Sequence, residues 1–75
     1  MNKYFYQIQS LIDDSTNLPD EIILTASKTV IINGTEAFAE ENNARLKTYC
    51  KSAGLQLKVL RSNRFFQFKI SAQIC

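Results

Sequence analysis

The strongest alternation of apolar and polar residues lies in the last third of the chain. Two alternating runs, 55–61 and 64–71, flank a Ser-Asn dipeptide at 62–63. A period of two is typical of a strand with one buried face, and asparagine tolerates the positive φ that a tight hairpin turn requires. The pattern therefore predicts an antiparallel hairpin in which Arg61 lies opposite Arg64.

This pairing assigns the side chains of the hairpin to two faces. One face is apolar and consists of Leu55, Leu57, Val59, Phe66, Phe68 and Ile70. The other is mostly polar and consists of Gln56, Lys58, Leu60, Phe65, Gln67 and Lys69. A register shift of one residue would mix the two sets, so their separation supports the hairpin.

Residues from about 35 to 53 carry a helical pattern. One stripe of this helix is apolar and consists of Phe38, Ala39, Leu46, Tyr49, Cys50 and Ala53. One of the asparagines at 42–43 is expected at the edge of this stripe. Asn33 or Thr35 would cap the first amides, and Gly54 would end the helix in the left-handed conformation. The acidic residues lie in the first turns and the lysines in the last, which complements the helix dipole.

The first half of the chain gives a weaker pattern. Residues 4–9 alternate and are rich in aromatic side chains, which predicts a half-buried strand. A helix would instead group Tyr4 with Ile8, Leu11 and Ile12. After a polar, turn-rich connection, residues 21–33 predict either one long bent strand or two short strands around an Ala-Ser-Lys turn.

These elements give the order β-β-α-β-β. We predict a small α+β fold with a single domain over residues 1–75, in which an antiparallel sheet of about four strands has one helix (about 35–53) packed on one face. The apolar fraction of 45% and the charged fraction of 21% are ordinary for a folded chain of this kind.

The composition argues against several kinds of chemistry. There is no histidine and there are two cysteines, so neither a histidine-dependent nucleophile nor a four-ligand cysteine–histidine zinc site is available. The acidic residues of the 13–21 segment lack the spacing of a calcium-binding loop. We therefore expect a non-catalytic protein without a metal or cofactor. Short apolar runs and an N-terminus without an apolar signal region lead us to expect a cytoplasmic protein with no membrane segment.

Charge is distributed unevenly along the chain. Residues 1–43 contain two basic and seven acidic side chains, a net charge of −5, whereas residues 44–75 contain seven basic and no acidic side chains, a net charge of +7. The total of +2 therefore hides a strong asymmetry. Clustered basic charge is typical of proteins that bind a polyanion or an acidic protein surface.

The polar face of the hairpin supplies the candidate site. Its residues are Gln56, Lys58, Phe65, Gln67 and Lys69, joined by Phe5 if the first strand keeps its alternation and by Arg61 and Arg64 at the tip. An aromatic ring stacks on an unpaired base for about 1–3 kcal/mol, cations position phosphates, and amides offer hydrogen bonds. The two arginines would repel each other unless a phosphate or carboxylate lay between them.

Two functions fit this face. The first is binding of nucleic acid or a nucleoprotein complex. It resembles in its physics the sheets of RNA-recognition domains, although the glycine–aromatic signature of that family is missing. The alternative is a protein-binding inhibitor or regulator that docks on an acidic partner, since the β-β-α-β-β outline also resembles that of several small phage-encoded anti-defence proteins. Either function is compatible with a monomer or a homodimer.

Overall fold

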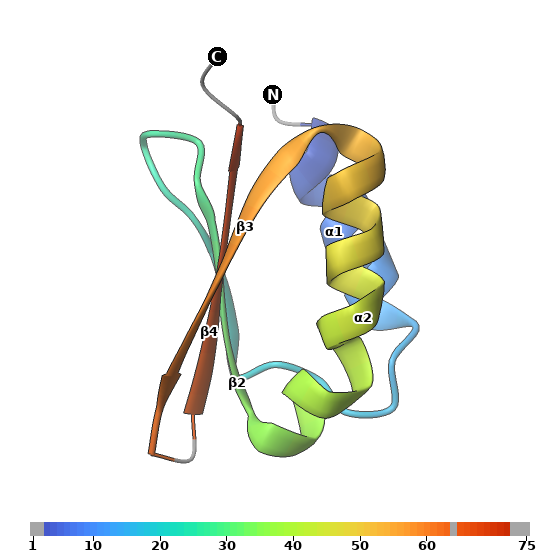
Figure 1. Ribbon diagram of the computed structural model, residues 1–75, viewed down its shortest axis with the longest axis vertical. Helices are drawn as coiled ribbons and strands as arrows, with labels where there is room; N and C mark the ends of the chain where they lie inside the picture. The colour runs from blue at the N-terminus through green and yellow to red at the C-terminus, as the bar shows by residue number, and fades with distance from the viewer. Residues whose placement is uncertain (1–2, 64, 73–75) are drawn as a thin grey trace.

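The computed structural model describes residues 3–63 and 65–72. Helices and strands follow one another along the chain in the order α1 (Lys3–Asp13), β1 (Glu21–Leu24), β2 (Val30–Thr35), α2 (Glu36–Ala53), β3 (Leu55–Ser62) and β4 (Phe65–Ala72). The strands form one antiparallel sheet in the order β1-β2-β4-β3. The predicted α+β fold, with a four-stranded antiparallel sheet and a long helix on one face, is confirmed (Figure 1).

The path of the chain places α2 on one face of the sheet. β2 and β3 both pair antiparallel with β4, so they run parallel to each other and need a crossover between them. α2 is that crossover, and α1 lies on the same side of the sheet (Figure 1). Within residues 3–63 and 65–72, the opposite side of the sheet carries no helix.

The predicted strand at residues 4–9 is wrong, because this segment belongs to α1. The buried side chains follow the helical spacing rather than the alternation. Ile8 and Ile12, one helical turn apart, are fully buried, whereas the side chain of Tyr6 is 52% exposed. The described part of the chain therefore has two helices rather than one. The two strands before α2 come from residues 21–35, which form the two short strands around a turn.

The hairpin is formed by β3 and β4, but its register differs from the predicted one by two residues. Ser62 lies opposite Phe65 and Arg61 opposite Phe66, so the expected pairing of Arg61 with Arg64 is wrong. Asn63 does adopt the positive φ expected of it, at 54°. Because the shift is an even number of residues, the side chains keep their predicted faces.

The core lies between the helices and the sheet. Cross-strand partners on β2 and β4 form its floor, and α2 contributes Phe38, whose ring meets that of Phe68 edge-on at 6.0 Å. Thr35 caps α2 by accepting a hydrogen bond from the Phe38 amide, and Gly54 ends it at φ 71°, both as expected. The buried side chains of the core are Ile8, Ile12, Val30, Ile32, Phe38, Ala39, Leu46, Cys50, Leu55, Phe68 and Ile70.

Polar contacts fasten α1 and the following loop to α2. The Glu41 carboxylate accepts hydrogen bonds from the backbone amides of Thr16 at 2.6 Å and Asn17 at 2.7 Å. Arg45 donates to the carbonyl of Leu11 at 2.9 Å, which satisfies a free acceptor near the end of α1. The first helix is thus held by long-range hydrogen bonds as well as by its apolar stripe.

We predict that Gly34→Ala destabilises the fold. A Cβ at this position would lie 2.5 Å from Cδ2 of the buried Phe38 ring. The ring would have to move within a packed core, which costs about 1–3 kcal/mol of the free energy of unfolding. Chemical denaturation of Gly34→Ala, in the natural background and with Phe38→Leu, tests this. An equal penalty in both backgrounds would contradict the proposed clash.

We predict that Glu41→Gln destabilises the protein at neutral pH and has little effect in acid. The amides of Thr16 and Asn17 lower the pKa of the Glu41 carboxyl below its usual range. A carboxyl with a lower pKa in the folded chain than in the unfolded one adds stability above the unfolded pKa and loses it as the pH falls through the folded pKa.

Melting temperatures of wild type and Glu41→Gln, measured from neutral pH down into the acid range, should therefore converge. Glu40→Gln, one residue away on the exposed surface of α2, is the matched control, and its difference from wild type should stay nearly constant with pH. A Glu41→Gln difference that does not shrink in acid would show that the carboxylate does not fasten the loop.

Candidate binding surface on the open sheet face

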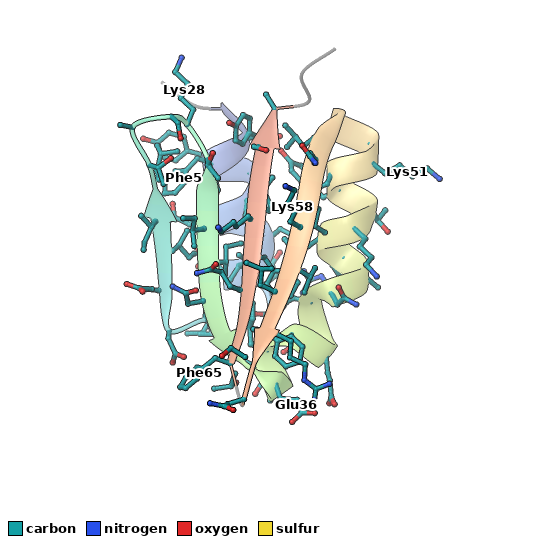
Figure 2. The ribbon with its side chains drawn as sticks, turned by 60° about the vertical axis from the view of Figure 1, so that its left-hand side comes forward. Phe5, Lys28, Glu36, Lys51, Lys58 and Phe65 are labelled. Carbon is teal, nitrogen blue, oxygen red and sulfur yellow. The ribbon has the colours of Figure 1, made fainter. Side chains whose placement is uncertain are left out.

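The side of the sheet away from the helices presents a continuous surface, here called the open face (Figure 2). Its side chains follow from the register of the four strands, because every second residue of each strand points to this side. They are Glu21, Ile23, Ile31, Asn33, Thr35, Gln56, Lys58, Leu60, Ser62, Phe65, Gln67, Lys69 and Ser71.

Two lysines lie directly opposite each other on this face. Lys58 of β3 and Lys69 of β4 are cross-strand partners, and the next residue across the sheet from Lys69 is Ile31. Direct partners on a sheet have Cβ atoms about 4.5–5.5 Å apart, and like charges placed directly opposite each other destabilise the sheet. An anion between them would remove this cost.

A shallow groove of about 340 Å³ surrounds the lysine pair at the end of the sheet near the β1–β2 turn. Among the described residues no carboxylate lines it, and four of its side chains carry hydroxyls: Thr25, Ser27, Thr29 and Ser71. Its other lining residues are Ile31, Gln56, Lys58 and Lys69. Hydroxyl, amide and ammonium groups all donate hydrogen bonds to oxygen anions. The groove therefore has the donor set that a phosphate or carboxylate needs.

The fold holds the hydroxyl groups of the β1–β2 turn in place. Thr25 Oγ1 accepts from the Thr29 amide at 3.1 Å and lies 2.9 Å from Ser27 Oγ. Lys28 has a positive φ of 65°, and its amide donates to the Thr25 carbonyl at 2.9 Å. This local network fixes the hydroxyls beside the groove without using all of their hydrogen-bonding capacity.

A chain of amide contacts crosses the middle of the open face. Gln67 donates to Asn33 Oδ1 at 2.9 Å, and Asn33 donates to Glu21 Oε1 at 2.9 Å. Gln67 retains its carbonyl oxygen and one N–H for a ligand. Glu21 lies on the edge strand β1, at the opposite edge of the sheet from β3. The positive charge of the open face is thus on its β3–β4 half.

The aromatic side chain of this face is Phe65, which is 58% exposed at the start of β4. It lines a depression of about 260 Å³ with Leu60, Ser62 and Gln67 among its neighbours. Figure 2 shows Phe65 at one end of the sheet and Lys58 further along β3. Lys69 is four positions along the same strand from Phe65, which corresponds to about 13 Å.

Five of the predicted site residues meet on the open face: Gln56, Lys58, Phe65, Gln67 and Lys69. Phe5 does not join them, because it lies on α1, where its ring packs edge-on against Tyr6 at 5.7 Å. Arg61 points to the helix side, with its guanidinium 5.5 Å from the centre of the Phe66 ring. Arg64 lies outside the described residues.

The basic charge of the second half of the chain is not gathered on one face. Lys51 points away from the sheet on the outer surface of α2 (Figure 2), and Arg45 is hydrogen-bonded between the helices. Among the residues that the structure describes, Lys58 and Lys69 are the cations of the open face. Any binding by this face therefore depends on few charges in defined positions.

The part of the open face that the β1–β2 hairpin forms was not predicted from the sequence. Asn33, Ile31 and the turn hydroxyls reach it because β2 pairs with β4 in the centre of the sheet. Residues 30–32 are apolar on both faces of the strand, and no local pattern indicates the strand order that places this hairpin beside β4.

Comparison with protein families, curated proteins and solved structures finds no match to this chain. Neither helix in the described part of the chain is long and apolar enough to cross a membrane. Within residues 3–63 and 65–72, no group of three or more cysteine, aspartate or glutamate side chains is arranged to hold a metal ion.

We predict that Lys58→Glu stabilises the protein at low ionic strength. The change replaces a repulsive cross-strand pair with an attractive one, which raises the free energy of unfolding by about 0.2–1 kcal/mol. The gain should fade as salt screens exposed charges. Lys47→Glu, the same charge change on α2, is the control. If both variants have the same stability in low-salt urea titrations, the lysine pair does not destabilise the sheet.

Proposed function

We propose that this protein is a non-catalytic binder of single-stranded nucleic acid and that the open face is its binding surface. The observation that carries the proposal is the direct pairing of Lys58 with Lys69 beside a hydroxyl-lined groove, on the same uncovered face as the exposed Phe65 ring. Such a like-charged pair lowers the stability of the free protein and would bind a phosphate in a complex.

The two parts of the site have separate tasks. Lys58, Lys69 and the groove hydroxyls hold a backbone phosphate. Phe65, about 13 Å away along β4, stacks on a base. Gln67 lies between Phe65 and Lys69 on β4, and Gln56 lies beyond the lysine pair, opposite Ser71. The side-chain amides of both glutamines can donate hydrogen bonds to base edges or accept them.

The exposed ring favours a single strand over a duplex. Bases in a duplex are stacked on their neighbours, and only unpaired bases can lie flat on a protein side chain. A sheet face with an exposed phenylalanine and two lysines suits sequence-tolerant contacts of this kind. Its small charge also predicts modest affinity with a shallow salt dependence, because the log–log slope is about −0.7 for each phosphate that is neutralised.

We predict that a short single-stranded oligothymidine binds wild-type protein at low salt and is released as salt rises. Lys58→Gln with Lys69→Gln should reduce the magnitude of the log–log salt slope by about 0.7 for each phosphate that the protein no longer neutralises. Phe65→Ala should weaken binding by about 5- to 150-fold with little change in that slope, because stacking does not release counterions. Fluorescence anisotropy at several salt concentrations measures both quantities.

The matched control is Lys47→Gln with Lys51→Gln, which removes the same charge from α2. This variant should bind almost as wild type does. An equal loss of affinity in both double variants would mean that net charge alone drives binding. If wild type does not bind the oligonucleotide at low salt, the open face is not a surface for single-stranded nucleic acid.

A further inference from the structure

A second surface of the molecule, the free edge of β3, adjoins the open face. β3 is an outer strand of the sheet, and no strand in the described ranges pairs with its outer side (Figure 2). It has eight residues in unbroken register with β4, without a bulge or a proline. Long, regular edge strands present a row of free backbone donors and acceptors, and proteins usually shorten or interrupt them.

Near the middle of this edge, one exposed apolar side chain lies on each side of the strand. Val59, on the helix side, is 40% exposed, and Leu60, on the open face, is 49% exposed. Two hollows flank the strand at this point. One of about 400 Å³ separates it from α2 and has Val59, Phe66 and Phe68 in its lining, and the other is the depression beside Leu60 and Phe65.

A strand added to a sheet edge uses features of this kind. Main-chain hydrogen bonds to the free edge supply affinity, and hollows on alternate sides receive alternate side chains of the added strand. We propose that β3 binds an extended, acidic segment of a partner protein by strand addition.

Charge identifies the chemistry of that segment. In residues 55–62 and 65–72 the hairpin has basic side chains and no acidic ones. An added strand would place every second side chain on the open face, and a carboxylate among them is favourable beside Lys58. The remaining side chains would enter the hollow next to α2. Glu36 and Glu40 line that hollow on the helix side and offset the charge of Arg61 on the strand side, while Val59, Phe66 and Phe68 give it apolar walls. Apolar residues therefore suit it better than acids.

The same charges argue against a second copy of this chain as the occupant. Pairing β3 with another β3 would add the Lys58 of both copies to the open face, with Lys69 beside it, and the Arg61 of both copies to the helix side. Like charges on adjacent strands are destabilising. A segment in which valine-like and glutamate-like residues alternate has the opposite charge and the period of two that the edge requires.

A capped peptide of alternating valine and glutamate, as long as β3, is the probe, and the matched valine–lysine peptide is its control. We expect the acidic peptide to shift the amide resonances of β3. It should also slow the hydrogen exchange of the β3 N–H groups that point away from β4. The basic peptide should have neither effect. Leu60→Glu should abolish these changes, whereas Leu18→Glu, the same substitution at an exposed loop leucine, should leave them intact. Lys58→Gln should weaken the binding about two- to fivefold.

Several results would overturn the proposal. These are the absence of β3 shifts with the acidic peptide, equal binding of the basic peptide, and shifts confined to the centre of the open face. Dimerisation of the free protein through β3, seen by light scattering and abolished by Leu60→Glu, would replace the proposed occupant with a second copy. None of these readouts uses an oligonucleotide, so they stand or fall separately from the nucleic-acid proposal.

Discussion

The fold depends on two cross-strand pairs at the centre of the sheet. Val30 lies opposite Ile70 and Ile32 opposite Phe68, and all four side chains are fully buried. Burying side chains of this size contributes about 1.5–3 kcal/mol each, which is large relative to the stability of a small domain. Because the apolar partners share one face of the sheet, both helices must pack there. The other face is left in water, and this leaves it available to a ligand.

The parts of the fold with a strong local pattern could be predicted from the sequence. The faces of the β3–β4 hairpin, the ends of α2 at Thr35 and Gly54, and the burial of Cys50 all follow from alternation, capping and periodicity. The hairpin register could not be fixed, because a shift of two residues preserves every face and only the turn geometry distinguishes the alternatives.

The errors arose where a short pattern had two interpretations or where a contact was non-local. Residues 4–9 satisfy both a strand and a helix, and only the burial of Ile8 with Ile12 decides between them. Phe5 was assigned to the open face because its segment, which is helical, was predicted as a strand. The strand order was not encoded in any local signal, so Asn33 was not assigned to the site at all. The candidate site was therefore recovered in its hairpin half and missed in its β1–β2 half.

The two proposed surfaces meet at Lys58, and this has a physical consequence. In the two proposed complexes this lysine would face a phosphate on the open face and a carboxylate of a strand added to the edge. One ammonium group cannot neutralise two anions as effectively as one, and the second anion would also be repelled by the first. Occupation of the edge by an acidic strand would therefore lower the affinity of the face for nucleic acid, and the reverse coupling would have the same magnitude because linkage between two binding sites is reciprocal. An acidic partner on β3 would in this way act as a competitor of nucleic acid without covering Phe65.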